Sequence, residues 1–136
     1  MPIATFHTIG CTPRQRRRLL EEGSVVYADV LGSPIERVRV YVTDHEPDSV
    51  AVGGRVVADG APAAPSFTAV VLEGRPAEQR ARLLAELTGL AADVLEVDPA
   101  LVRGHVVQVS GEDWGIGGTP AAQVRAAEIR QRTDGA

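Results

Sequence analysis

The chain has 136 residues and a formal net charge of −4, from 14 basic and 18 acidic side chains. Phosphate binding requires an excess of positive charge, so this balance argues against a nucleic-acid partner. All the basic residues are arginine, which excludes Schiff-base chemistry on a lysine side chain and leaves the N-terminus among the few candidate amines.

The first half of the chain reads as strand, helix, strand. Residues 3–9 have strand-like content, and a helix is expected to begin after Thr12, because threonine caps helices and Gln15 completes a capping box. This helix should run to about Leu31, where a Gly-Ser-Pro sequence ends it. Residues 37–42 alternate polar and apolar side chains, as a half-buried strand does.

The same order returns in the second half. Residues 45–64 are rich in Gly, Pro, Ala and Asp, which predicts a connector with one short hairpin around 50–57. A strand is then expected over 67–72, a helix beginning at Pro76 with a regular apolar stripe, and a strand over 102–109.

Two pairs of matching segments indicate an internal duplication. Residues 33–39 align with 97–103, which makes Arg39 and Arg103 counterparts, and Val52-Gly53-Gly54 aligns with Ile116-Gly117-Gly118. Both pairs share an offset of 64 residues (97 − 33 and 116 − 52), as a duplication would leave.

These patterns predict one α+β domain over residues 1–136, with repeat one at about 2–60 and repeat two at about 65–132. Two β-α-β units side by side would give a four-stranded sheet with both helices on one face. The other face would stay bare and largely apolar, which favours packing against further copies of the chain.

The remaining features narrow the chemistry and the location. Cys11 is the single cysteine, so no intramolecular disulfide forms, and a reducing, cytoplasmic location is expected. No run approaches the roughly 18 apolar residues of a membrane span, so no membrane partner is expected. His7, His45 and His105 lie on separate elements without ligand spacing, which predicts no metal site, and no cofactor motif is present.

Five short segments carry a more specific signal. They are Pro2-Ile3-Ala4, Leu72-Glu73-Gly74-Arg75, Glu78-Gln79, Val102-Arg103 and Trp114-Gly115-Ile116-Gly117-Gly118. Together they resemble the tautomerase superfamily, and 4-oxalocrotonate tautomerase in particular. The resemblance implies the tautomerase fold, a homotrimer, and a cofactor-independent isomerase that acts on a small 2-oxo or enol carboxylic acid.

The resemblance also implies roles for individual residues. Pro2 matches the general base, once the initiator methionine is removed. Arg75 matches the arginine that binds the substrate carboxylate, and Arg103 matches the second active-site arginine, a role that its counterpart Arg39 would fill if the other repeat faces the proline. A guanidinium group suits both tasks, because it holds a carboxylate with two hydrogen bonds and stabilises developing negative charge. Trp114 matches an aromatic pocket wall.

Two further residues, Tyr41 and His105, are substrate-binding candidates, because they lie on the strands that carry Arg39 and Arg103. The first repeat departs from the family, since Gly10-Cys11-Thr12 stands where Glu-Gly-Arg is expected. Pro65, the counterpart of Pro2, is an amide within the chain. Only one site of the usual kind is therefore expected per chain.

Longer relatives leave alternatives open. Malonate semialdehyde decarboxylase and cis-3-chloroacrylic acid dehalogenase have a similar length and add a carboxylate that positions or activates water, for which Asp113 and Glu36 are candidates. The alternative activity is therefore a decarboxylase, hydratase or dehalogenase of a small 3-oxo or unsaturated acid that uses Pro2 with Asp113 or Glu36. The second alternative is a non-catalytic oligomer that binds a small carboxylate.

Overall fold

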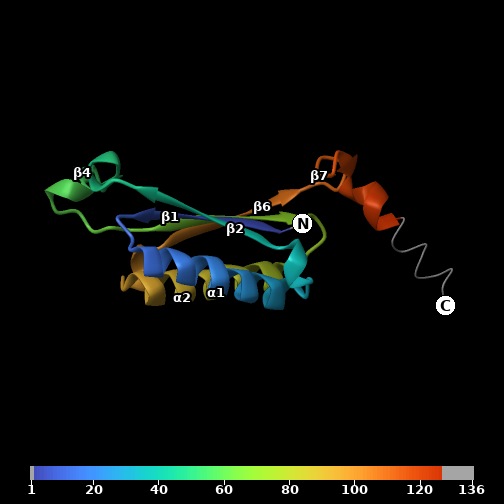
Figure 1. Cartoon of the computed structure of the whole chain (residues 1–136), viewed down its shortest axis with the longest axis horizontal. Coiled ribbons are helices and arrows are strands. Elements are labelled where there is room, and N and C mark those ends of the chain that lie inside the picture. Colours follow the sequence, from blue (N-terminus) through green and yellow to red (C-terminus); the bar gives the residue numbers. More distant parts are fainter. Residues whose placement is uncertain (1, 127–136) are drawn as a thin grey trace.

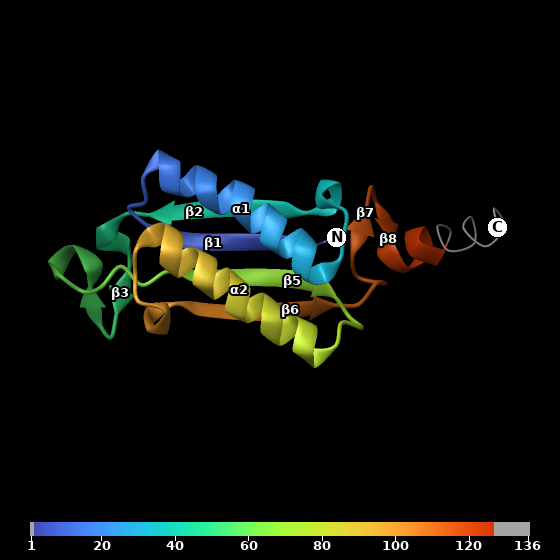
Figure 2. The same cartoon turned by 90° about the horizontal axis from the view of Figure 1, so that it is seen from below.

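Four seven-residue strands form one sheet in the computed structural model, which describes residues 2–126. They are β1 (Ile3–Ile9), β2 (Arg39–His45), β5 (Ser66–Leu72) and β6 (Arg103–Val109), in the order β2-β1-β5-β6. The pairs β1–β2 and β5–β6 are parallel, and the central pair β1–β5 is antiparallel. Each half of the chain therefore contributes one parallel pair, and the halves meet in the middle of the sheet (Figure 2).

Two 19-residue helices, α1 (Pro13–Leu31) and α2 (Ala77–Leu95), cover the same face of the sheet (Figure 1). The predicted capping box is present at the start of α1. The backbone N–H of Gln15 donates to Thr12 Oγ1 at 3.1 Å, and the backbone N–H of Thr12 donates to Gln15 Oε1 at 2.8 Å. Gly32 ends α1 with a φ of 62°, a left-handed conformation that glycine adopts without a steric penalty.

The core lies between the sheet and the helices. Along β1 and β5 every second residue is buried, as expected for strands with one covered face. The rings of Phe6 and Phe67, opposite each other on these strands, lie 5.9 Å apart between centroids and are tilted by 52°. The largest fully buried side chains are Tyr27, Phe6, Phe67, Leu19, Leu83, Leu87, Val71 and Thr8.

Short elements project from the two ends of the sheet (Figure 1). The connector forms the predicted hairpin from β3 (Ala51–Val52) and β4 (Arg55–Val56), and β7 (Gly115–Ile116) pairs with β8 (Thr119–Pro120) in the corresponding place of the second half. Residues 121–126 are helical. Four 3₁₀ turns complete the elements: Ile35–Arg37, Pro47–Ser49, Val57–Asp59 and Pro99–Leu101.

The predicted α+β architecture, a four-stranded sheet with two helices on one face, is confirmed. Two details differ. β2 begins at Arg39, two residues later than expected, because Ile35–Arg37 forms a 3₁₀ turn closed by a hydrogen bond from Val38 N–H to the Ile35 carbonyl. The uncovered face is mixed rather than largely apolar, since it carries Thr5, His7, Thr43, Thr68 and His105 beside Ile3, Tyr41 and Val107.

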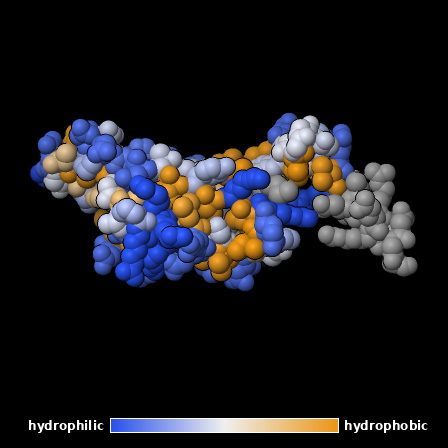
Figure 3. Space-filling view, viewed as in Figure 1, coloured by the Kyte–Doolittle hydropathy of each residue, from blue (hydrophilic) through white to orange (hydrophobic). Residues whose placement is uncertain are grey.

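The surface combines apolar and hydrophilic residues on another side of the molecule as well. Figure 3 shows apolar and hydrophilic residues interspersed on the side seen there, with apolar residues most frequent in the middle. Within residues 2–126 no helix is long and apolar enough to cross a membrane.

Candidate active site

Pro2 lies at one end of the sheet, directly before β1, and is buried. Its carbonyl oxygen accepts a hydrogen bond from the backbone N–H of Arg39 at 3.0 Å. Because β1 and β5 are antiparallel, with Ile3 opposite Val70, this end of β1 lies beside the end of β5 and the loop after it. The second repeat therefore supplies much of the surroundings of Pro2.

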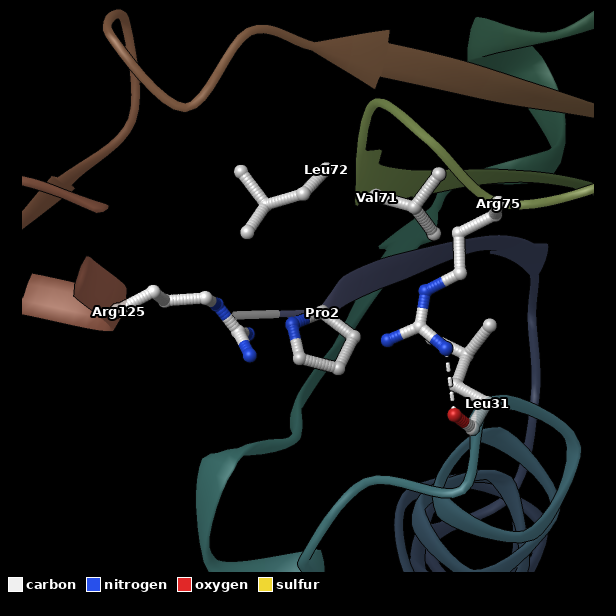
Figure 4. Close-up of a pocket in the computed structure, with 6 residues that line it drawn as sticks. All are labelled: Pro2, Leu31, Val71, Leu72, Arg75 and Arg125. Atoms are coloured by element: carbon white, nitrogen blue, oxygen red, sulfur yellow. Dashed lines mark hydrogen bonds between the residues drawn. The ribbon is translucent and has the colours of Figure 1, made fainter. Parts of the chain in front are cut away.

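Arg75 lies in the loop between β5 and α2, which turns through Gly74 at a φ of 107°. Its guanidinium group has three acceptors. Nη1 donates to the Leu31 carbonyl oxygen and, at 3.4 Å, to Gln79 Oε1, and Nη2 donates to the Ser33 hydroxyl at 3.4 Å. Figure 4 shows the hydrogen bond to Leu31. The end of α1 and the first turn of α2 thus fix the orientation of this side chain.

The charge of Arg75 is influenced by burial and by two neighbours. Partial burial and the positive charge of Arg125 lower the pKa of the Arg75 guanidinium, whereas the phenol of Tyr27 acts in the opposite direction. Arginine side chains remain protonated in folded proteins, so Arg75 stays charged at neutral pH. The site therefore holds a permanent positive charge beside Pro2.

Arg125 is a second guanidinium at this place, and the sequence did not predict it. It lies in the helical segment 121–126, which is anchored by hydrogen bonds from Ala121 N–H to the Trp114 carbonyl at 2.7 Å and from Ala122 N–H to the Gly111 carbonyl at 3.0 Å. This segment lies beyond the segments that carry the family resemblance. No sequence signal that we considered singles it out.

Pro2 lies between the two guanidinium groups, with its ring nitrogen on the side of Arg125 (Figure 4). The hollow between them has a volume of about 10 Å³ and is also lined by Leu31, Val71 and Leu72. A neighbouring cavity of about 370 Å³ shares Leu72, Arg75 and Arg125 with this hollow and extends over the loop from Glu73 to Pro76 and Gln79. The larger cavity therefore opens directly beside the hollow that Pro2 lines.

The predicted residues Arg39 and Trp114 are brought together in another cavity at the same end of the sheet. This cavity has a volume of about 210 Å³ and is also lined by Ile3, Glu36 and the β7 turn. Trp114 is 8% exposed, so most of its ring is packed, whereas Arg39 is exposed. Of the two candidate acids, Glu36 lies at this cavity. Asp113 is exposed and lines none of the cavities described here.

Arg103 lies at the opposite end of the sheet from Pro2. Its backbone N–H donates to the carbonyl oxygen of Pro65 at 3.2 Å, as Arg39 does to Pro2. The seven residues of β5 separate the two ends, which corresponds to about 20 Å at the usual rise of a strand. Within one chain, Arg39 therefore lies at the Pro2 end and Arg103 does not.

Tyr41 and His105 lie on the uncovered face, away from the hollow around Pro2. Tyr41 is 53% exposed and lies opposite Thr5 on β1. His105 Nε2 lies 3.5 Å from the Thr68 hydroxyl oxygen, in the half of β6 that begins at Arg103.

Two of the three histidines meet, although their sequence spacing gave no sign of it. His7 Nδ1 lies 3.0 Å from His45 Nε2 and the rings are stacked, because β1 and β2 pair in parallel with these residues near their ends. Among residues 2–126, no group of three or more His, Cys, Asp or Glu side chains is arranged to hold a metal ion.

Comparison with known proteins finds one matching family and several similar proteins. The family model described as "Tautomerase enzyme" matches residues 2–60 and 69–123. The 2-hydroxymuconate tautomerase of Pseudomonas sp. (strain CF600) is 38% identical over 55 residues, which are 40% of this chain and 87% of that protein. That relative thus corresponds in length to a single repeat.

Solved structures match the chain over both repeats. A native fused 4-OT is 30% identical, with a TM-score of 0.85 over 90% of this chain and 98% of the other. A fused 4-OT called R7, an asymmetric trimer, is 26% identical with a TM-score of 0.83 over the same shares of the two chains. N1, a member of the cis-3-chloroacrylic acid dehalogenase family, is 23% identical with a TM-score of 0.75 over 90% of this chain and 88% of the other, and shows the fold alone.

Proposed function

Because the chain belongs to the tautomerase family, whose sequence model matches both repeats, we propose that it is an isomerase of a small 2-oxo or enol carboxylic acid, with Pro2 as the general base. The family predicted from the short motifs is confirmed, as is the form with two fused repeats. Membership in the family supports an enzyme of the tautomerase type. The substrate and the roles of individual residues are our proposal.

The observation that carries the proposal is the placement of Pro2, buried between the guanidinium groups of Arg75 and Arg125. If the initiator methionine is removed, Pro2 has a free secondary amine at this position. Burial and two positive charges disfavour the ammonium form and lower the pKa of the amine below the usual value of about 8. The amine then accepts a proton near neutral pH, as a general base requires.

The chemistry needs one proton and no added reagent. Arg75 holds the carboxylate of the substrate, and the Pro2 nitrogen removes the proton of the enol hydroxyl group. The electron pair of that O–H bond forms the carbonyl, the carbon–carbon double bond shifts, and the resulting carbanion takes the proton back from the Pro2 ammonium. The neighbouring guanidinium groups stabilise the negative charge that spreads over the 2-oxo group in between. Pro2 returns to its starting state.

The remaining site residues are proposed to act around this centre. Arg39 and Trp114 line the adjoining cavity and would bind a part of the substrate that extends toward β7. Tyr41 on the uncovered face, and Arg103 with His105 near the other end of the sheet, would contribute only to the site of a neighbouring copy. We therefore propose a homotrimer, as in the fused 4-OT that is 26% identical. We also propose that the repeats, about 2–60 and 65–132, form one domain, with the end of repeat two outside the described residues.

The other candidate function is hydration or decarboxylation that uses a carboxylate side chain in addition to Pro2. One observation favours Glu36 over Asp113 as that side chain. Glu36 lies at the cavity that Arg39 and Trp114 line, where a carboxylate would meet water and substrate together. In this alternative, Glu36→Gln abolishes turnover of an unsaturated acid and leaves enol ketonisation unchanged. Loss of ketonisation in Glu36→Gln would assign Glu36 to the isomerase instead.

The proposal is tested with the ketonisation of phenylenolpyruvate. Mass spectrometry of the intact protein first establishes whether Met1 has been removed. Pro2→Ala should then lower kcat/KM by about tenfold or more, because it replaces the ring amine with a less constrained primary amine, whereas loss of the base itself costs at least about 100-fold. A variant with one residue kept before Pro2 retains the side chain but converts the amine into an amide, and it should lose activity as well.

Pro65→Ala is the matched control. Pro65 occupies the corresponding place in repeat two and is buried like Pro2, but it has no amine. It should retain activity. Equal background rates in the Pro2 variants and in the unaltered protein would support the non-catalytic alternative, in which the chain only binds a carboxylate.

A further inference from the structure

The hydroxyl group of Tyr27 contacts the strand pair next to Pro2. Tyr27 is fully buried in α1, and its hydroxyl donates to the Val70 carbonyl oxygen at 2.7 Å, with the Ile3 carbonyl oxygen at 3.4 Å. Ile3 follows Pro2 directly and pairs with Val70, so the hydroxyl contacts both central strands at the end where Pro2 lies. One side chain of the helix therefore holds this end of the strand pair.

The same part of α1 also holds Arg75. Leu31, four residues after Tyr27, accepts a hydrogen bond from Arg75 Nη1 through its carbonyl oxygen (Figure 4). Residues four apart lie about one turn apart on the same side of a helix. The position of Pro2 relative to Arg75 therefore depends on two contacts of the last turns of α1, one to the strands and one to the arginine.

The Tyr27 hydroxyl remains a donor at neutral pH. Burial raises the pKa of this phenol, and the charge of Arg75 opposes that effect only in part. A buried hydroxyl group is costly unless it forms a hydrogen bond, so the phenol is stable only where it reaches a carbonyl oxygen. The bond therefore restricts where this end of the strand pair lies relative to α1.

The second repeat fills its core without a tyrosine at the corresponding place. The helices are offset by 64 residues (77 − 13 and 95 − 31), so Ala91 of α2 is the counterpart of Tyr27, and it is buried as well. The buried residues of the central strand pair are alanines near Pro2 and phenylalanines toward the other end: Ala4 opposite Ala69, and Phe6 opposite Phe67. Apolar rings are thus sufficient for the core at that end. Core packing alone does not account for the hydroxyl group at the end with the N-terminal amine.

We infer that Tyr27 is a positioning residue, which fixes Pro2 relative to Arg75 by anchoring the paired ends of β1 and β5 to α1. This inference rests on the proposed function of Pro2 as the base. Tyr27 lines none of the cavities described above, so it acts on the site through the backbone. Its loss should change the rate and the pKa of the amine rather than substrate binding, since Arg75 keeps its three acceptors.

Tyr27→Phe tests the inference, because it keeps the ring and removes only the hydroxyl group. We expect kcat for phenylenolpyruvate to fall about three- to tenfold and KM to stay within about twofold. A less restricted Pro2 can move away from the guanidinium groups, so the pKa of its amine should rise by at least about 0.3 toward the usual value of about 8.

The pKa of the amine is measured in two ways once mass spectrometry has confirmed the loss of Met1. The first is ¹⁵N NMR of protein labelled at proline, with the amine resonance assigned by its absence from Pro2→Ala. The second is the acidic limb of the pH profile of kcat/KM, which reports the base of the free enzyme.

Thr8→Val is the matched control. The Thr8 hydroxyl is also fully buried, and it donates to the Asp44 carboxylate at 2.6 Å near the end of β1 that is remote from Pro2. Hydrogen bonds to charged groups are the stronger ones, so Thr8→Val should lower Tm at least as much as Tyr27→Phe. It should leave kcat and the pKa of the amine unchanged.

Unchanged kcat and an unchanged amine pKa in a folded Tyr27→Phe protein would overturn the inference. Equal changes in Thr8→Val would do so as well, because Tyr27 would then contribute stability alone. The proposed base is tested separately, since NMR measures the amine without turnover. If Pro2→Ala kept full turnover while Tyr27→Phe still raised the pKa of the amine, Pro2 would not be the base, but Tyr27 would still position its nitrogen.

Discussion

Two glutamines join the helices, and only one of them touches the candidate site. Gln15 Nε2 donates to the Val94 carbonyl oxygen at 3.2 Å, and Gln79 Nε2 donates to the Val30 carbonyl oxygen at 3.0 Å. The glutamines are counterparts in the two repeats, and so are the valines. Gln79 Oε1 additionally accepts a hydrogen bond from Arg75. Replacing each glutamine with alanine therefore separates a contribution to stability from a contribution to the site.

The expected sizes follow from these contacts. Gln79→Ala loses one neutral hydrogen bond between the helices and the long one from Arg75, together worth about 1–1.5 kcal/mol, which lowers Tm by about 3–7 °C in a chain of this length. Gln15→Ala loses the equivalent bond and also its half of the capping box with Thr12, so it should be at least as destabilised, by about 1.5–2 kcal/mol.

The effects on catalysis should fall in the opposite order. In Gln79→Ala, Arg75 keeps its acceptors at Leu31 and Ser33 but loses the third, so its orientation is less restricted. We expect kcat/KM for phenylenolpyruvate to fall about three- to tenfold, which corresponds to about 0.7–1.4 kcal/mol. Gln15→Ala should keep the unaltered rate.

Both measurements are made on the same preparations, with thermal unfolding followed by circular dichroism and ketonisation followed by absorbance. The comparison would refute the reasoning if Gln15→Ala lost as much activity as Gln79→Ala. It would also do so if activity followed Tm in both variants, since the loss would then reflect stability alone.

Two further predictions concern the fold. A Cβ atom at Gly104 would overlap the ring of Phe67, so Gly104→Ala should destabilise the protein by about 3 kcal/mol in urea unfolding. A Cβ atom at Gly89, in the interior of α2, meets no heavy atom within 4 Å, so Gly89→Ala should stabilise the protein by about 0.5–1 kcal/mol. Burial acts to raise the pKa of Asp44, but hydrogen bonds from a backbone amide and, at 2.6 Å, from the Thr8 hydroxyl hold it below its usual value. The stabilisation is therefore complete above about pH 4 and lost as the pH falls through the lowered pKa, so Asp44→Asn should show a smaller difference in Tm between pH 7 and pH 3.

Local signals in the sequence predicted the elements well. The Thr12 and Gln15 pair placed the start of α1, and the glycine after Leu31 placed its end, because capping depends on residues within one turn. The sequence also predicted the duplication and, through it, a sheet with both helices on one face. The start of β2 was wrong by two residues, because the 3₁₀ turn at Ile35–Arg37 has no strong sequence signal.

The composition of the site could be predicted only in part. Pro2 and Arg75 were chosen from motifs, but their proximity depends on the antiparallel pairing of β1 with β5, which no local pattern specifies. Arg125 was missed for the same reason, since it reaches Pro2 through the tertiary placement of a short segment. The contact between His7 and His45 also depends on strand register rather than on spacing along the chain.

On the proposed mechanism, the antiparallel pairing also explains why one chain would need both repeats for one site. Pro2 belongs to repeat one and Arg75 to repeat two, and the pairing brings the start of one repeat to the loop of the other. At the opposite end the same geometry places Pro65 near the loop with Cys11 and Thr12. An amide proline cannot shuttle a proton, so an arginine in that loop would serve no base.

On the proposed mechanism, the loop of repeat one, with Cys11 and Thr12, therefore needs no arginine, whereas the loop of repeat two needs Arg75. Its Thr12 caps α1, and Cys11 donates its backbone N–H to Asp44, so both residues contribute to local structure. On the proposed mechanism, the difference between the loops follows from the position of the N-terminal amine, because an arginine would be needed only where a proline nitrogen accepts a proton.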